Sequence, residues 1–161
     1  MRVHRTDFTL NDGLAMALIV AGVSLALAQT DSVGVVILTP AEMKWTAQGV
    51  YAEPGMEQLN LIGDPAKSGP YTLRLKLPRG YRIAPHTHPD AHEVTVLSGT
   101  LATGYGEKFD ETGLKVLPAG SFYTQPANVP HYIEIKEDVV LQVSGKGPSS
   151  RHFVNAASGP K

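Results

Sequence analysis

The sequence of 161 residues contains no cysteine. This absence excludes disulfide bonds, thiolate metal sites and cysteine nucleophiles, and it leaves the redox compartment open. An excess of charge of one sign is also lacking, because 14 basic and 15 acidic residues leave a net charge of −1. We therefore expect neither nucleic acid nor an acidic membrane surface as a partner. The chain has no internal repeat or low-complexity segment, and its length suits one domain with a real core.

The one long apolar run lies near the N-terminus, from Leu14 to Ala28. Two arginines precede it and it ends in Ala26-Leu27-Ala28, a pattern typical of a secretory signal peptide. The run is short for a membrane span. We therefore predict a signal peptide over residues 1–28 and an exported protein, periplasmic or secreted, that begins at Gln29 on N-terminal sequencing. Two aspartates near the start are unusual in such a segment, so an uncleaved anchor is the alternative.

The rest of the chain, residues 29–161, lacks any long amphipathic helical pattern. Turn residues recur about every 8–12 positions, which is typical of an all-β barrel or sandwich. Tyr71–Leu77 alternates apolar and polar residues, as a strand with one buried face does. We expect a single all-β domain with its core at about 35–155. The residues predicted to face inward are Leu73, Leu75, Val94, Val96, Ile133 and Ile135.

The start of this domain is expected to hold a strand over Val33–Thr39, followed by a helical turn. Thr39 has the character of an N-cap, Pro40 suits the first helical position, and Glu42 stands where a capping-box glutamate belongs. The sequence therefore predicts one short capped turn before the barrel begins.

Three of the six histidines fall within seven residues, at His86, His88 and His92. Prolines on either side of the first two exclude a helix there. In an extended strand, residues two apart point to the same side, so the imidazoles of His86 and His88 share a face. Two imidazoles on one strand face are half of a metal site. A hairpin after this strand would bring His92 or Glu93 back to that face.

Together with two glycines, this stretch resembles the first motif of the cupin family. That motif runs glycine, five residues, His-x-His, three or four residues, glutamate, about six residues and glycine. Gly80, His86, His88 and Gly99 fit it as they stand. The position of the glutamate is less clear, because the common spacing places it at His92 and a looser spacing at Glu93.

A second segment, Gly120–His131, resembles the second cupin motif: glycine, five residues, Pro-x-Gly, two residues and histidine. Asn128 stands where the family usually has glycine. Because asparagine is the non-glycine residue that most readily accepts a positive φ, we expect Asn128 to make the same turn. The family's asparagine four positions after the histidine is absent, and Ile135 stands there.

The resemblance implies a double-stranded β-helix, the cupin jelly-roll barrel, with a metal site that uses His86, His88 and His131. For the fourth ligand, strand parity favours His92, because Val94 and Val96 then continue the inward face and Glu93 faces out. Four neutral imidazoles favour Fe, Ni, Cu, Co or Zn, whereas a glutamate ligand favours Mn or Fe. We therefore expect a divalent transition metal as cofactor.

Cupins with such sites include dioxygenases, isomerases, lyases and pure binding domains, so the fold does not select a reaction. Two hypotheses remain. The protein is a metal-dependent, dioxygenase-like enzyme acting on a small organic molecule, or it is a non-catalytic exported barrel that binds a metal or small molecule. Family habit also suggests a homodimer.

Five further polar residues lie close to the motifs or interrupt an apolar run. Four of them are expected either to line the cavity or to serve as barrel packing: Tyr81, Tyr105, Tyr123 and Gln125. Gln142 is polar within an apolar run, and it either hydrogen-bonds a ligand histidine or faces outward from an edge strand.

Overall fold

Two antiparallel sheets of five strands each form the part of the chain that the structure, a computed structural model, describes. These residues are 34–51 and 53–155, and they belong to a unit that spans Asp31–Lys161. The predicted signal peptide, residues 1–28, lies outside the described residues and stays a prediction. Within residues 34–51 and 53–155, no helix is long and apolar enough to cross a membrane.

The described strands alternate with short turns and two 3-10 helices. The strands are β1 (Glu57–Ile62), β2 (Gly69–Leu77), β3 (Arg82–Thr87), β4 (His92–Ser98), β5 (Thr100–Tyr105), β6 (Lys115–Pro118), β7 (Phe122–Gln125), β8 (His131–Ile135), β9 (Val139–Gly147) and β10 (His152–Phe153). The 3-10 helices are η1 (Pro40–Glu42) and η2 (Glu111–Gly113).

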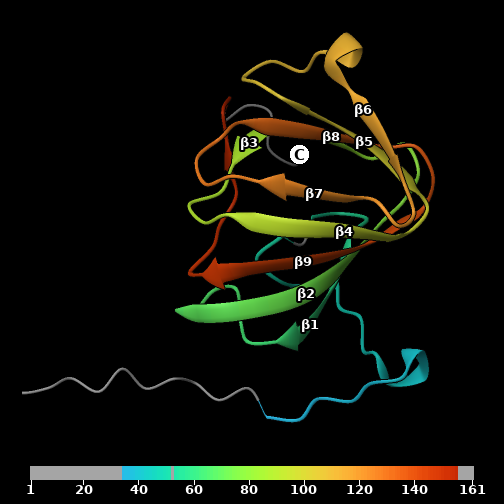
Figure 1. Cartoon of the computed structure of the whole chain (residues 1–161), viewed down its shortest axis with the longest axis vertical. Coiled ribbons are helices and arrows are strands. Elements are labelled where there is room, and N and C mark those ends of the chain that lie inside the picture. Colours follow the sequence, from blue (N-terminus) through green and yellow to red (C-terminus); the bar gives the residue numbers. More distant parts are fainter. Residues whose placement is uncertain (1–33, 52, 156–161) are drawn as a thin grey trace, which may run out of the picture. The chain divides into compact units, whose positions relative to one another are not determined.

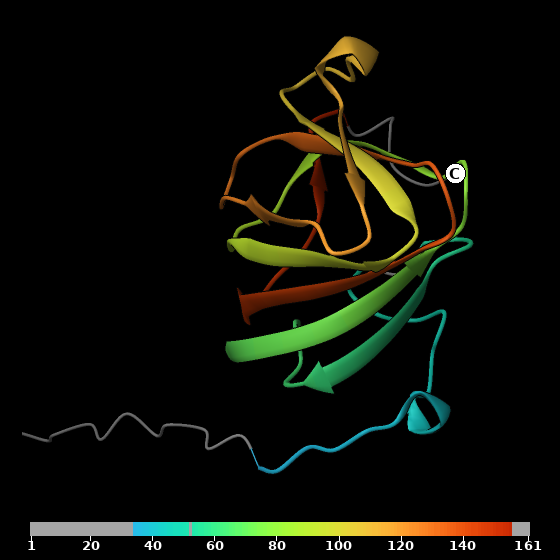
Figure 2. The same cartoon turned by 45° about the vertical axis from the view of Figure 1, so that its right-hand side comes forward.

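The strand order shows the jelly-roll topology. One sheet has the order β1-β2-β9-β4-β7 and the other β10-β3-β8-β5-β6, so strands distant in sequence are neighbours in each. Figures 1 and 2 show the two sheets packed face to face, with β4, β9 and β2 side by side in one of them. The all-β prediction and the cupin jelly-roll fold are confirmed.

The core lies between the two sheets and follows the predicted alternation. All six residues predicted to face inward are buried, with at most 6% of any of them exposed. Gly99 lies between β4 and β5 with a φ of 72°, and a Cβ at this position would collide with the carbonyl oxygen of Asp138. The glycine of the first motif is therefore required by the tight passage from β4 into β5.

The predicted strand over Val33–Thr39 is wrong, since residues 34–39 form no strand. Its apolar side chains find no sheet to pack on, and those of Val35 and Ile37 are 94% and 82% exposed. β-branched composition alone does not make a strand without a partner. The predicted turn is confirmed at η1, where the backbone N–H of Thr39 donates to the Glu42 carboxylate at 2.8 Å.

Candidate metal centre

Strand pairing brings the histidines of the two motifs together. β3 and β8 are antiparallel neighbours, and His86 lies directly opposite His131 in their register. Residues opposite each other on one face of such a pair have Cβ atoms about 4.5–5.5 Å apart. The two imidazole centroids are accordingly 4.2 Å apart, and that of His88 lies 5.0 Å from His86 and 5.3 Å from His131.

The turn before β8 adopts the conformation predicted for it. Asn128 has a φ of 60° and is the one non-glycine residue with positive φ in the described part of the chain. Its backbone N–H donates to the carbonyl oxygen of His88 at 2.8 Å. The turn of the second motif is thus tied directly to the first motif, which holds His131 beside His88.

Backbone carbonyls fix the orientation of all three rings through Nδ1. The Nδ1···O distances are 2.7 Å from His86 to Ala84, 2.7 Å from His88 to Ser150 and 3.0 Å from His131 to Val129. Because a carbonyl only accepts, each Nδ1 carries the proton and each Nε2 keeps a lone pair. One ring nitrogen from each histidine lies within 4.8 Å of the others.

Burial keeps these imidazoles neutral. The cost of placing a charge in the barrel, together with the neighbouring His131, lowers the pKa of His86 to about 2. Burial is also the largest cause of the lowered pKa of His88, followed by the nearby His92. The pKa of His131 falls to about 4, again mainly through burial. Neutral rings are the form in which imidazoles bind a metal ion.

His92 lies beside this group but its ring nitrogens point elsewhere. It faces inward from β4, is 2% exposed, and its ring centroid is 4.2 Å from that of His88. Its Nδ1 is 2.9 Å from Oε1 of Gln125, its partner across β4 and β7. Its Nε2 is 3.2 Å from both Tyr51 Oη and Asp90 Oδ1. Glu93, the alternative fourth ligand, is exposed on the opposite face of β4.

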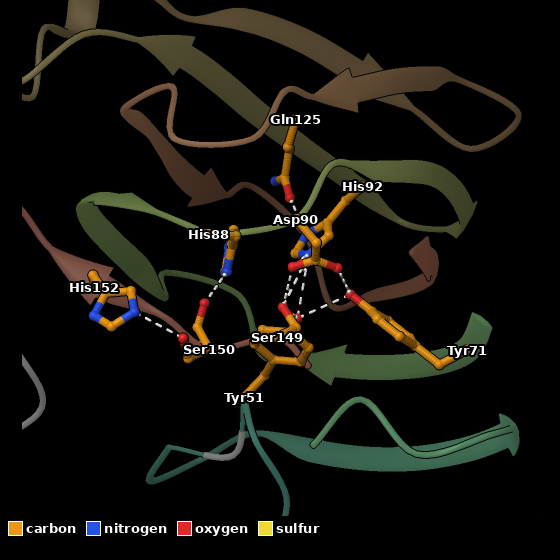
Figure 3. A network of polar contacts seen from close by, with 9 residues as sticks. All are labelled: Tyr51, Tyr71, His88, Asp90, His92, Gln125, Ser149, Ser150 and His152. Atoms are coloured by element: carbon orange, nitrogen blue, oxygen red, sulfur yellow. Dashed lines mark hydrogen bonds and ion pairs between the residues drawn. The ribbon is translucent and has the colours of Figure 1, made fainter. Parts of the chain in front are cut away.

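A buried polar cluster surrounds Nε2 of His92 (Figure 3). Asp90 accepts from the Ser149 hydroxyl and, at 2.8 Å, from Tyr71 Oη. Tyr51 Oη lies 2.5 Å from Ser149 Oγ and 3.1 Å from Tyr71 Oη. Asp90 is therefore a carboxylate held by donors close to the histidines, although its own oxygens do not belong to the group of three.

Two of the three histidines, His86 and His88, line a small cavity between the sheets, and the ring centroid of His131 lies 4.2 Å from that of His86. About 30 Å³ is free inside this cavity, which is room for roughly two water molecules. Polar residues share its walls with apolar core residues. The polar residues that line it are Tyr51, His86, His88, His92, Tyr123, Gln125 and Arg151.

A family model for a domain of unknown function (DUF4437) matches residues 31–152. The chain belongs to this family. No curated protein sequence matches the chain.

Several solved structures have a similar fold. The crystal structure of the RmlC-like cupin from Shewanella frigidimarina has a TM-score of 0.55 and 15% identity, and the match covers 71% of this chain and 92% of that one. The polyketide cyclase RemF from Streptomyces resistomycificus has a TM-score of 0.56 and 18% identity, over 76% and 89%.

A third solved structure is salicylate 1,2-dioxygenase from Pseudoaminobacter salicylatoxidans in complex with gentisate. Its TM-score is 0.50 at 16% identity, and the match covers 62% of this chain and 27% of that chain. At such identities the similarities establish the cupin fold and leave the chemistry to the site itself.

In this protein, the residues predicted to line the cavity divide into two pairs. Tyr123 and Gln125 line it, as predicted. Tyr81 instead donates to Glu53 at 2.6 Å, and Tyr105 is 48% exposed, with its hydroxyl on the Thr124 carbonyl.

Gln142 faces away from the cavity, because it alternates with buried neighbours on β9 and accepts from Arg74 at 3.3 Å. The glutamine that contacts a histidine is Gln125. Sequence reasoning missed Asp90, Ser149 and Arg151, which lie outside the strands: Asp90 occupies a variable spacer position of the first motif, and the other two follow β9, outside both motifs.

Proposed function

We propose that this cupin is a metal-dependent enzyme of the oxygenase type, in which His86, His88 and His131 bind one divalent transition metal ion. One observation carries the proposal: Nε2 of His131 is buried without a hydrogen-bond partner, beside two other imidazoles whose Nδ1 atoms are also fixed. A buried polar atom without a partner costs about 1–3 kcal/mol. A metal ion at this point would satisfy that lone pair and those of its two neighbours.

The donor set fits nitrogen-preferring metals. Three neutral imidazoles suit Fe, Co, Ni, Cu or Zn, and the outward position of Glu93 removes the carboxylate that would favour Mn. We propose His92 as the fourth contributor, because its ring adjoins that of His88; to reach the ion, its Nε2 would have to turn away from Tyr51 and Asp90, each 3.2 Å away. When bound, such an ion supplies Lewis acidity and, for Fe, Ni or Cu, chemistry with dioxygen.

The chain's own residues would orient and enclose the reactants. Carbonyls hold the three imidazoles in one tautomer, which keeps their Nε2 atoms available as ligands. The apolar walls, which include Leu75, Ile83 and Ile133, exclude bulk water from this end of the barrel. Asp90 and the hydroxyl of Tyr51 lie on the His92 side, where they can hold or pass a proton.

A non-catalytic metal-binding barrel is the second candidate, and the small size of the cavity favours it. Room for roughly two waters leaves too little space for a whole substrate beside an ion. A substrate could enter this cavity only with one end of its molecule.

Elemental analysis and oxygen uptake separate the two candidates. We expect about one transition metal ion per chain in protein from the native host. Loaded with Fe or Ni, it should consume oxygen with at least one compound of an enolic and phenolic panel, and His131→Gln should abolish this uptake. Metal binding without uptake across the panel would favour the binding barrel, and absence of any stoichiometric metal would reject both.

Replacement of His92 should weaken metal binding, whereas replacement of Glu93 should not. His92 faces the ligand group and Glu93 faces solvent from the same strand. Loss of even an indirect partner typically lowers metal affinity about 10–100-fold, so His92→Ala should lose at least that much. Competition with a chelator of known affinity measures the change. Loss of metal in Glu93→Ala with retention in His92→Ala would show that the fourth position is assigned wrongly.

A further inference from the structure

Three buried side-chain atoms lack a hydrogen-bond partner in the part of the chain that the structure describes: His131 Nε2, Tyr123 Oη and Arg151 Nε. Native proteins leave few such atoms, and each one calls for an explanation. Tyr123 and Arg151 both line the cavity that His86 and His88 also line. Two of the unsatisfied atoms therefore belong to residues that line the cavity, and the third belongs to His131, whose ring centroid lies 4.2 Å from that of the lining residue His86.

Arg151 is held in place and yet incompletely used. Its side chain is only 7% exposed, and its Nη1 pairs with the carboxylate of Glu53, which is 11% exposed. The guanidinium carbon lies 5.7 Å from the ring centroid of Tyr51. Arginine carries five N–H donors in a rigid plane, and the pair with Glu53 leaves the Nε–H of this cavity-lining residue without a partner.

Tyr123 lies on β7, an edge strand of its sheet, and its hydroxyl has no hydrogen-bond partner. It lies two residues before Gln125, so both side chains point to the cavity side of the strand. Burial raises the pKa of its phenol, so the hydroxyl keeps its proton and can donate. Its oxygen has no acceptor within the protein.

We propose that this cavity binds the carboxylate group of a small organic acid, with Arg151 Nε–H and Tyr123 Oη–H as its donors. The proposal rests on the proposed function and deepens it, since it assigns the substrate of the metal site to the carboxylic acids. Two donors without acceptors match an acceptor-only group, and a carboxylate is one.

Charge and size both favour this ligand. Three neutral imidazoles add no negative charge to balance a divalent ion, the nearby Asp90 carboxylate offsets only one of its two charges, and the Arg151–Glu53 pair adds no net charge. An anion bound beside the ion offsets that charge in a site that excludes water. The free space of about 30 Å³ admits one small planar group and excludes a bulky one, so the carboxylate enters as one end of the molecule.

The test uses acetate as the probe and acetamide as its neutral isostere, titrated by calorimetry into the full-length protein loaded with Ni²⁺. We expect acetate to bind at least about tenfold more tightly than acetamide, in line with the greater strength of hydrogen bonds to charged groups. Tyr123→Phe should weaken acetate binding about tenfold. The same variant should keep the metal and lose no thermal stability, because the removed hydroxyl has no partner to lose.

Two further variants complete the design. Arg151→Lys keeps a cation beside Glu53, so the chain should fold, yet the loss of the planar fork should weaken acetate binding about tenfold. Tyr132→Phe is the matched control, because Tyr132 is a buried tyrosine whose hydroxyl donates to the Asp110 carbonyl at 3.1 Å, outside the cavity lining. It should lower the melting temperature and leave acetate affinity unchanged.

Equal affinity for acetate and acetamide would overturn the proposal, and so would unchanged acetate binding in both Tyr123→Phe and Arg151→Lys. Failure of the metal site itself is a separate result. If the wild type holds no metal, the same titration of the metal-free protein still tests the two donors. We then expect acetate to bind more weakly than to a metal-loaded protein, and Tyr123→Phe to weaken it further.

Discussion

His131→Ala is expected to lower metal affinity by more than about 100-fold, because loss of an indirect partner alone typically costs 10–100-fold. The substitution removes the one imidazole contributed by β8, opposite His86 in the register of β3 and β8. Its Nε2 is buried and has no hydrogen-bond partner. After the substitution, no side chain already bonded at this point can replace the imidazole as a ligand. His86→Ala should give a loss of similar size, since its ring is fixed in the same way through the Ala84 carbonyl.

His152→Ala provides the matched control for these substitutions. His152 lies on β10, next to β3 in the same sheet, but its side chain is exposed and bonds only the hydroxyl of Ser150 at 2.7 Å. Its removal should leave metal content unchanged after dialysis, as measured by elemental analysis. Full metal retention in both His86→Ala and His131→Ala would contradict the site altogether.

The histidine cluster was predictable from the sequence because local rules place each of its members. Strand periodicity aligns His86 with His88, and the positive φ of Asn128 supplies the turn that the second motif needs before His131. Both features depend on a few adjacent residues and on their spacing. The same rules placed the six inward residues correctly, since a strand that alternates in a barrel buries one face.

The surroundings of the cluster were not predictable because they depend on contacts between distant segments. Arg151 pairs with Glu53 across 98 positions, and Ser149 contacts Tyr51 across the same separation. Neither pair has a local pattern in the sequence. Gln125 meets His92 through the register of β4 with β7. Hydrophobic alternation alone does not fix this register, because a shift by an even number of residues keeps the same face buried.

Two groups of buried polar residues therefore lie near the candidate metal centre, and they differ in character. In the first, Asp90 collects donors from Ser149 and Tyr71 and lies against His92. In the second, Arg151 and Tyr123 present donors that find no acceptor. The first network is satisfied within the protein and suits the movement of a proton, whereas the second is unsatisfied and suits the binding of a ligand.

The metal-free protein should lose stability steeply as the pH falls below about 6.5, the ordinary pKa of histidine in an unfolded chain. In the folded protein, burial lowers the pKa of His86 to about 2 and that of His131 to about 4, and it lowers the pKa of His88 as well. Between the folded and unfolded pKa values, each of these residues is neutral when folded and protonated when unfolded. Unfolding then takes up protons, so stability falls with falling pH.

Each of the three groups contributes up to about 1.4 kcal/mol per pH unit to this slope. The contribution of His131 should level off near pH 4, where its folded form also becomes protonated, whereas that of His86 continues to lower pH. Urea unfolding of chelator-treated protein at pH 7.5, 6.5, 5.5 and 4.5 measures the effect. His131→Gln should reduce the slope between pH 5.5 and 4.5 by about a third, since it removes one of three equivalent proton acceptors. A free energy of unfolding that stays constant from pH 7 to 5 would mean that these imidazoles are already charged or exposed in the folded protein.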